Sequence, residues 1–299
     1  MTNNLVLINA SLWMVLALMW GSSYSMIKLG VASLDPIVLV AGRMAIGAVL
    51  IFSVMTLMGQ TLSKNKNVWF SYAVTGLLGS TLPFLLITYG EQSVDSALAS
   101  ILMGVAPVAT VVLASITLPE ERLTKRVLAG VCFSIIGIVI LIGPNALSHL
   151  GDGFSSQLSI IGATLCYAAS TVYIKRFVRR PALEMASGSM LVGTLSIVFV
   201  AILMGKNLFD LELTMTSMGV IIYLGLFSTG CANLIYFYLV PRLGATRMSQ
   251  INFAVPVVGS LIGFAFLDEM VTTNQVIALL VIVLAIYLVL TGSKKVDKA

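Results

Sequence analysis

Residues 20–28 read Trp20-Gly-Ser-Ser-Tyr-Ser-Met-Ile-Lys28, and residues 167–175 read Tyr167-Ala-Ala-Ser-Thr-Val-Tyr-Ile-Lys175. The two stretches align at a shift of 147 positions, with an aromatic residue, a serine, an isoleucine and a lysine in register. At a shift of 149, further identical residues pair in the same order: Tyr89 with Tyr238, Pro107 with Pro256, Glu120 with Glu269, and Thr124 with Thr273. A recurrence at nearly one offset indicates that the chain consists of two related halves.

Apolar runs with short polar breaks extend along the whole chain of 299 residues. Apolar residues make up 59% of the sequence, charged residues make up 10%, and the mean hydropathy is +1.04. A soluble domain carries roughly a quarter charged residues, so most of this surface must face lipid. Ten runs are each long enough to cross a hydrocarbon core of roughly 30 Å as a helix: Leu5–Gly30, Pro36–Met58, Val68–Tyr89, Ser96–Leu118, Thr124–Ile142, Gln157–Phe177, Leu183–Met204, Ser217–Val240, Ala245–Leu267 and Thr273–Leu290.

The length of these runs distinguishes helices from the strands of a membrane barrel. Barrel strands have about ten residues and alternate in polarity, whereas these runs are longer and apolar throughout. The sequence therefore predicts an all-α polytopic membrane protein with ten transmembrane helices.

Basic residues fall on alternate breaks between the runs. One side would hold the N-terminus, the C-terminal tail and the breaks 59–67, 119–126, 175–182 and 241–247, and it carries 14 of the 17 Lys and Arg residues. Cytoplasmic loops are enriched in Lys and Arg. We therefore expect a multi-pass protein of the inner (plasma) membrane with both termini in the cytoplasm.

Each half contains an odd number of expected helices, so the second half enters the membrane from the opposite side. We divide the chain into a first repeat at residues 1–143, an extracytoplasmic linker at 144–156, and a second repeat with a cytoplasmic tail at 157–299. Two inverted five-helix repeats around a central cavity are typical of secondary carriers, which bind solute near the midplane.

The first expected helix carries candidate solute-binding residues on one face. Trp20, Tyr24 and Lys28 follow one another at a spacing of four residues, which places them on the same side of a helix. The rings would stack on a solute and the lysine would attract an anion. Ordinary helix packing, with the lysine extending outward to the interface, is the alternative interpretation.

Arg43 lies seven residues inside the second expected helix, about 10 Å from its start. A charge at that depth is costly and marks a functional candidate. It would hold a solute carboxylate in bidentate fashion. The alternative is a structural ion pair with Asp35, Glu91 or Asp95.

Prolines within the runs predict hinges at Pro83, Pro107 and Pro256, which would free the carbonyls of Gly79, Met103 and Asn252. Polar side chains in other runs need hydrogen-bond partners, either in a solute or in a neighbouring helix. The candidate solute-binding residues are Trp20, Tyr24, Lys28, Arg43, Tyr89, Met103, Asn233, Tyr236 and Asn252.

Several classes of function are disfavoured. The three cysteines lie in apolar runs and the one histidine lies in an expected loop, so we expect no metal site, no cofactor, no disulfide framework and no catalytic activity. No phosphate-binding loop is present, which disfavours ATP-driven transport. The basic residues set topology, so no nucleic-acid partner is expected. Acidic residues cluster at the ends of runs, and we expect no proton relay through a buried acid.

The chain resembles the drug/metabolite transporter superfamily, specifically its EamA-type ten-helix exporters. Trp20-Gly-Ser-Ser-Tyr24 with Lys28, Pro36 with Arg43, and the run from Ala97 to Pro107 that leads to Pro119-Glu-Glu-Arg-Leu-Thr124 carry the likeness. The second half departs from the first, because Met270 and Val271 replace Glu121 and Arg122 and the helix-two arginine is missing.

The resemblance implies a helical basket around a central cavity, alternating access, and export or exchange of amino acids, aromatic ones among them, or of similar small organic metabolites. Export of drugs or nucleosides and, from another class, a passive channel are the alternatives. We expect the lipid bilayer and a small-molecule solute as partners, and a monomer.

Overall fold

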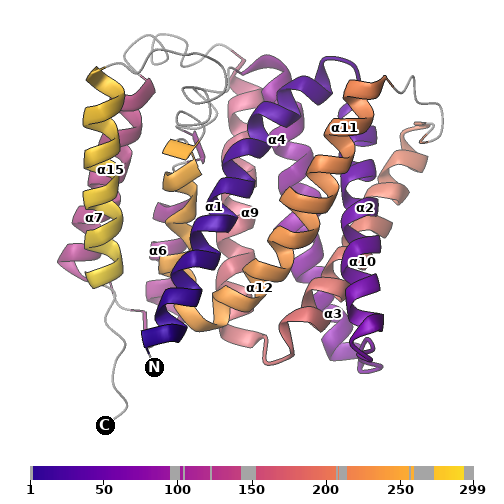
Figure 1. Ribbon diagram of the computed structural model, residues 1–299, viewed down its shortest axis with the longest axis horizontal. Helices are drawn as coiled ribbons and strands as arrows, with labels where there is room; N and C mark the ends of the chain where they lie inside the picture. The colour runs from indigo at the N-terminus through magenta and orange to yellow at the C-terminus, as the bar shows by residue number, and fades with distance from the viewer. Residues whose placement is uncertain are drawn as a thin grey trace.

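The computed structural model describes residues 3–94, 102–103, 105–121, 123–142, 153–206, 208, 214–255, 257–258 and 273–292. Every regular element within these ranges is helical (Figure 1). The α-helices are α1 (Asn3–Val31), α2 (Pro36–Leu57), α3 (Lys66–Gly76), α4 (Leu82–Ser93), α6 (Val105–Thr117), α7 (Lys125–Ile142), α9 (Phe154–Phe177), α10 (Ala182–Leu203), α11 (Met215–Tyr223), α12 (Ala232–Leu243), α13 (Ala245–Ser249) and α15 (Thr273–Gly292). Two π-helical segments, η1 (Leu77–Thr81) and η2 (Leu224–Cys231), join α3 to α4 and α11 to α12.

Six stretches of the described chain are long and apolar enough to cross a membrane: Leu5–Val31, Pro36–Leu57, Lys66–Ser93, Phe154–Phe177, Ala182–Leu203 and Met215–Leu243. Two shorter apolar helices lie at Ala106–Thr117 and Val276–Val289. Large apolar side chains such as Leu57, Phe199 and Leu203 are exposed on the outer surface. Lipid is the solvent that such a surface requires, so the chain is an all-helical, polytopic membrane protein. The count of ten helices stays a prediction, because parts of the runs Ser96–Leu118 and Ala245–Leu267 lie outside the described residues.

The second helix of each expected half ends in the same way. Both α2 and α10 finish with Leu-Met-Gly, and the glycines Gly59 and Gly205 adopt positive φ angles of 66° and 64°. Only glycine takes up this left-handed conformation without strain, and it closes the helix through reverse hydrogen bonds. In the first half these run from Gln60 N to Met55 O, and in the second from Lys206 N to Ala201 O. The offset between the two caps is 146 residues (205 minus 59).

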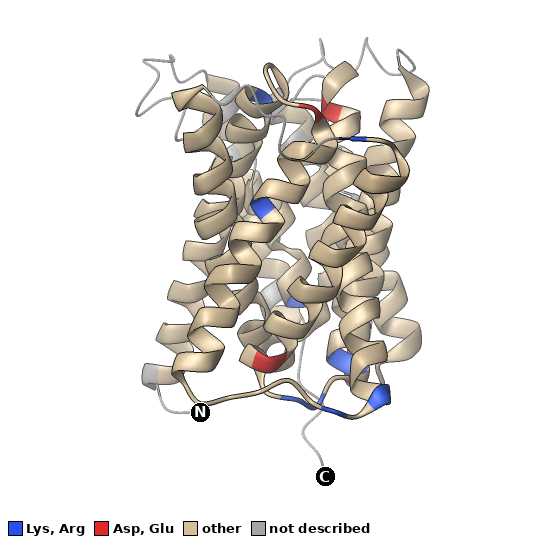
Figure 2. Cartoon of the chain, turned by 90° about the vertical axis from the view of Figure 1, so that its right-hand side faces the viewer, with Lys and Arg blue, Asp and Glu red and all other residues tan. Residues whose placement is uncertain are grey.

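Contacts at the two ends of the bundle agree with the alternation of the loops. At one end, the Lys206 ammonium lies 2.7 Å from the Asp35 carboxylate, so α2 begins where α10 ends. This hydrogen-bonded pair raises the pKa of Lys206 above its ordinary value. At the opposite end, Glu121 contacts Ala245, and Lys175 donates to the Pro241 carbonyl. Figure 2 shows Lys and Arg gathered along the loops at this end, where the N-terminus also lies.

Glycines bring the helices of the two halves into backbone contact. A Cβ placed on Gly76 of α3 would lie 2.3 Å from the Ser189 carbonyl oxygen of α10 and 3.1 Å from the Gly193 nitrogen. At a second crossing between the halves, a Cβ on Gly47 of α2 would lie 3.3 Å from the carbonyl oxygen of Gly225 in η2. Gly76 and Gly225 differ by 149 positions, and Gly47 and Gly193 by 146, so the same crossing occurs twice. Small residues permit this approach, which holds helices together in lipid.

The helices α7 and α15 form a separate pair at one side of the bundle (Figure 1). Gly130 and Gly137 of α7 face Val289 and Ile282 of α15 at distances that leave no room for a Cβ. Thr124 caps α7, since its hydroxyl accepts from the Val127 amide at 3.2 Å and donates to the Gly292 carbonyl at 3.1 Å.

The glycine crossing leads to a prediction about stability. The change Gly76→Ala forces α3 away from α10, and we expect it to destabilise the protein by about 1–3 kcal/mol, as overpacked cores do. Thermal unfolding of the purified protein in detergent measures the loss as a lower midpoint. The control is Gly219→Ala in α11, where an added Cβ meets no atom within 4 Å. An equal effect of the two changes would contradict a special role for the crossing.

Candidate functional site

A cavity opens between the two halves, lined by α1, α2, α4, α6, α9, α12 and α13. Its walls consist of Trp20, Ser23, Tyr24, Ile27, Arg43, Phe84, Ile87, Met103, Thr110, Tyr167, Thr171, Tyr236, Met248, Ser249, Ile251, Asn252 and Val255. The cavity volume that the centre of a water molecule can occupy is about 50 Å³. This is room for about three to five waters, so a larger solute requires the walls to move apart.

Two parts of the cavity wall come from the sequence stretches that align between the halves. Trp20 and Tyr24 lie on α1, while Tyr167 and Thr171 occupy the positions 147 residues later on α9. The ring of Tyr236 from α12 joins these walls. Its centroid lies 5.6 Å from that of Trp20, and its hydroxyl shares a hydrogen bond with Thr171. The site is therefore a narrow aromatic slot with hydroxyl groups along it.

Arg43 supplies positive charge to the cavity wall. Its side chain is buried, its Nε donates to the Thr229 hydroxyl at 3.0 Å, and its guanidinium carbon lies 4.1 Å from the centroid of the Phe84 ring. The ion pairs of the described residues do not include Arg43. Among its expected acidic partners, Asp35 pairs with Lys206, both Glu91 oxygens lack a hydrogen-bond partner, and Asp95 lies outside the described residues.

The guanidinium of Arg43 therefore retains donors that face a cavity instead of a protein carboxylate. A bound carboxylate would accept two parallel N–H bonds from it. The contacts with Thr229 and Phe84 fix the side chain in place, so little rotamer entropy remains to be lost when a solute binds.

Six of the nine candidate residues meet at the cavity: Trp20, Tyr24, Arg43, Met103, Tyr236 and Asn252. The other three lie elsewhere. Lys28 is exposed on α1, and Tyr89 is 38% exposed on α4. Asn233 is buried, and its amide donates to the Thr229 carbonyl one turn back at 2.8 Å. A solute-binding role for any of these residues stays a prediction.

The candidate hinges fall in different settings. Pro83 is buried at the start of α4, directly after the π-segment η1, and Gly79 lies inside that segment. Pro107 lies in the first turn of α6, where a missing N–H costs no helix hydrogen bond. Pro256 lies outside the described residues.

Several cavity residues were not among the candidates. Tyr167 and Thr171 could have been found by carrying Trp20 and Tyr24 across the repeat offset. Phe84 and Ile87 had no such signal, because apolar side chains that face a cavity look like those that face lipid. The segment η2, which holds Thr229 against Arg43, contains no proline to reveal it.

Carboxylates close the end of the bundle at which the basic loops lie. Glu121 accepts from the backbone amides of Ala245 and Thr246, both at 2.7 Å, and so ties the end of α6 to the start of α13. Its neighbour Glu120 is exposed. Glu121 thereby ties the two halves together at the end of the bundle that holds the basic loops.

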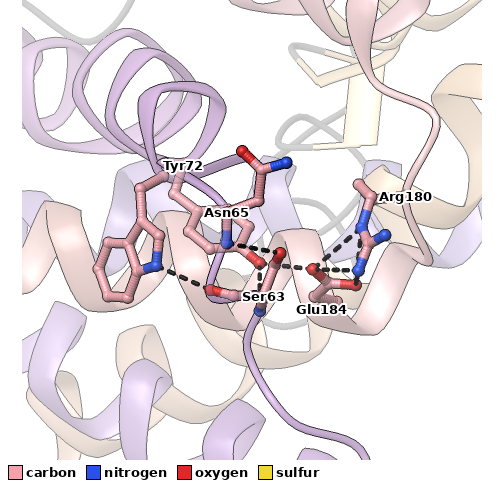
Figure 3. Close-up of polar contacts among 6 residues, drawn as sticks. Ser63, Asn65, Tyr72, Arg180 and Glu184 are labelled. Carbon is pink, nitrogen blue, oxygen red and sulfur yellow. Dashed lines mark hydrogen bonds and ion pairs between the residues drawn. The ribbon is translucent and has the colours of Figure 1, made fainter. Parts of the chain in front are cut away.

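A second tie at the same end joins α3 to α10. Figure 3 shows Tyr72 donating to Glu184 at 2.6 Å, while Arg180 holds the same carboxylate at 2.9 to 3.1 Å. The amide of Ser63 donates to the Tyr72 hydroxyl at 3.3 Å, which links the preceding loop to the network. Arg180 is partly exposed, so this pair adds less than a buried one would.

Comparisons with known proteins agree with this architecture. A solved structure described as "Crystal structure of protein" superimposes with a TM-score of 0.77 at 19% identity, over 96% of this chain and 99% of that one, which shows the fold. The uncharacterized transporter YoaV of Bacillus subtilis is 24% identical over 91% of this chain and 92% of its own length. The uncharacterized inner membrane transporter YedA of Escherichia coli is 26% identical over 93% and 89%.

A family model describes both halves of the molecule. The model of the EamA-like transporter family matches residues 8–143 and again residues 155–291. These matches span most of the chain, and the cavity lies between the two matched regions. The chain is therefore a membrane transporter that belongs to the EamA-like transporter family, within the drug/metabolite transporter superfamily.

Proposed function

We propose that this protein is a secondary carrier that exports or exchanges amino acids, aromatic ones among them, or similar small organic metabolites by alternating access. The observation that carries the proposal is Arg43, a buried cation without an acidic partner among the described residues, placed in an aromatic slot. A solute with a carboxylate and an apolar or aromatic side chain would complement both features.

Counting cations narrows the solute class further. Among the described residues that line the cavity, Arg43 is the only Lys or Arg. A phosphorylated sugar or a nucleotide would need several such groups to offset its charge. A zwitterion with one carboxylate therefore fits better than a multiply charged anion.

The test of the proposed function is a counterflow assay in proteoliposomes with a panel of radiolabelled amino acids. We expect saturable uptake of aromatic amino acids that is accelerated by the same solute inside. A passive channel, the alternative, would show linear flux without counterflow. If nucleosides or drugs show saturable counterflow and amino acids show none, the proposed solute class is wrong and the carrier mechanism still holds.

A prediction concerns Arg43. In Arg43→Gln, the loss of a charge-assisted bidentate contact should raise the half-saturating concentration of the preferred amino acid by about 10- to 100-fold. The corresponding amino-acid amide lacks the carboxylate, so its half-saturating concentration should be about equal for wild type and variant. Arg176→Gln, an exposed change on α9, is the matched control. Equal weakening of acid and amide would show that Arg43 supports the cavity without binding the carboxylate.

A second prediction concerns Glu121. Replacing it by Gln weakens the tie to α13, and we expect the closed end of the bundle to open more often. The measurement is maleimide labelling of Ser249→Cys, a cavity position, in a background without Cys132, Cys166 and Cys231. The rate of labelling from the side of the basic loops should rise about tenfold, which corresponds to a change of roughly 1.4 kcal/mol in the free energy of opening. Glu120→Gln is the exposed control.

We also propose that the protein lies in the inner membrane with both termini in the cytoplasm. The basic loops at one end of the bundle support this orientation. The relative YedA carries the inner membrane in its name. The labelling experiment tests the orientation as well, because reagent added to right-side-out vesicles should reach Ser249→Cys from the end opposite the basic loops. Preferential labelling in inside-out vesicles, where the reagent meets the cytoplasmic face, would reverse the assignment.

A further inference from the structure

Glu91 lies in the last turn of α4 and is 0% exposed. Both of its carboxylate oxygens are buried and have no hydrogen-bond partner among the described residues. The sequence led us to expect acidic residues at the ends of the apolar runs and no proton relay through a buried acid, and Glu91 does lie near such an end. Its position near the end of a helix did not reveal that the neighbouring elements cover it.

The other buried glutamates of the described chain show what a structural carboxylate looks like here. Glu121 accepts from two backbone amides, and Glu184 accepts from Tyr72 and Arg180. Within the described part of the chain, Glu91 makes no comparable hydrogen bond. A packing role does not require a carboxylate that is left unpaired, since a buried polar group without partners costs free energy.

Glu91 lies in line with the cavity. Phe84, Ile87 and Glu91 follow at spacings of three and four residues, which places them on one face of α4. Phe84 and Ile87 line the cavity. Glu91 therefore continues this wall toward the end of the bundle that holds Asp35 and Lys206.

Charged and titratable groups from the described helices α1 and α2 lie near this position. Lys28 and Tyr24 from α1 and Arg43 from α2 are close enough to interact with Glu91 electrostatically. On the α9 side, a Cβ on Gly90 would lie 2.6 Å from Ile160, and Tyr167 interacts with Tyr24 and Arg43. Neither cation is within 4.0 Å of Glu91, as the ion pairs of the described chain show.

This arrangement has two favourable states. With the cations at their present distance, the carboxyl group avoids an uncompensated buried charge by holding a proton. If α1 or α2 moves so that Lys28 or Arg43 reaches the carboxylate, the ionised form gains a partner and the proton leaves. Proton occupancy and helix position are thereby linked.

We propose that Glu91 is a proton-binding site that couples the conformational change of the carrier to proton movement. The carboxylate takes one proton from water on one side of the membrane, forming a neutral acid, and releases that proton to water on the other side after the helices move. This inference rests on the proposed carrier function. It adds the proton as the co-transported ion.

The first test needs no substrate. Infrared difference spectra of the purified protein in nanodiscs, recorded between acidic and alkaline pH, should show the carbonyl stretch of a buried protonated carboxyl group. The band should vanish in Glu91→Gln and persist in Glu120→Gln, which changes an exposed carboxylate. Glu91→Asp, which keeps the carboxyl group, should retain a shifted band if Glu91→Gln fails to fold. A wild-type protein without this band, or a band unchanged in Glu91→Gln, overturns the proposal.

The second test uses a solute identified by counterflow, with the membrane potential clamped at zero. If the wild type exchanges one proton for each solute molecule, each unit of pH difference across the membrane should drive about tenfold accumulation of the solute. In Glu91→Gln the gradient should have no effect while solute-for-solute counterflow continues. If transport by the wild type shows counterflow but does not depend on the pH gradient, proton coupling is rejected and the carrier function still holds. Absence of counterflow for the whole panel rejects the proposed solute class, and the infrared band then decides on Glu91.

Discussion

The structure depends on backbone contact at two helix crossings. Lipid offers no hydrophobic drive for helices to associate, so close packing must hold the bundle together. Gly76 admits α10, and Gly47 admits η2. The second crossing also positions the cavity charge, because a Cβ on Gly47 would lie 2.8 Å from the side chain of Thr229, the residue that accepts from Arg43.

The two halves share a scaffold and differ in chemistry. The glycine crossings, the Leu-Met-Gly caps and the π-segments occur in both halves at offsets of 146 to 149 residues, as subtraction of Gly59 from Gly205, Leu77 from Leu224 and Gly76 from Gly225 shows. Arg43 has Ser189 as its counterpart 146 positions later. Near that serine, the Thr81 hydroxyl donates to the Gly193 carbonyl and not to a cavity group. The repeat thus explains the helix scaffold, and a departure from the repeat, Arg43 in place of a serine, provides the charge in the cavity.

Sequence reasoning succeeded where local chemistry marks a position. The bounds of α2 follow from Asp35-Pro36 at its start and Gly59 after its end, and the structure places the helix at Pro36–Leu57. Trp20 and Tyr24 reach the cavity as their shared face suggested. Lys28 shares the same stripe but lies nearer the end of α1, where it is exposed. Spacing identifies a face of a helix, whereas depth and the neighbouring elements decide what covers that face, as Glu91 also shows.

The narrowness of the cavity has an electrical consequence. A volume of about 50 Å³ between aromatic rings holds only a handful of waters, too few for a continuous water column across the bilayer. In the part of the chain that the structure describes, Glu121 and Glu184 tie helices together at the end that holds the basic loops, and this arrangement favours a low ion conductance in the absence of solute. A solute larger than a few waters would have to separate the rings of Trp20, Tyr167 and Tyr236, so we expect any gap for ions to widen only while a solute occupies the cavity.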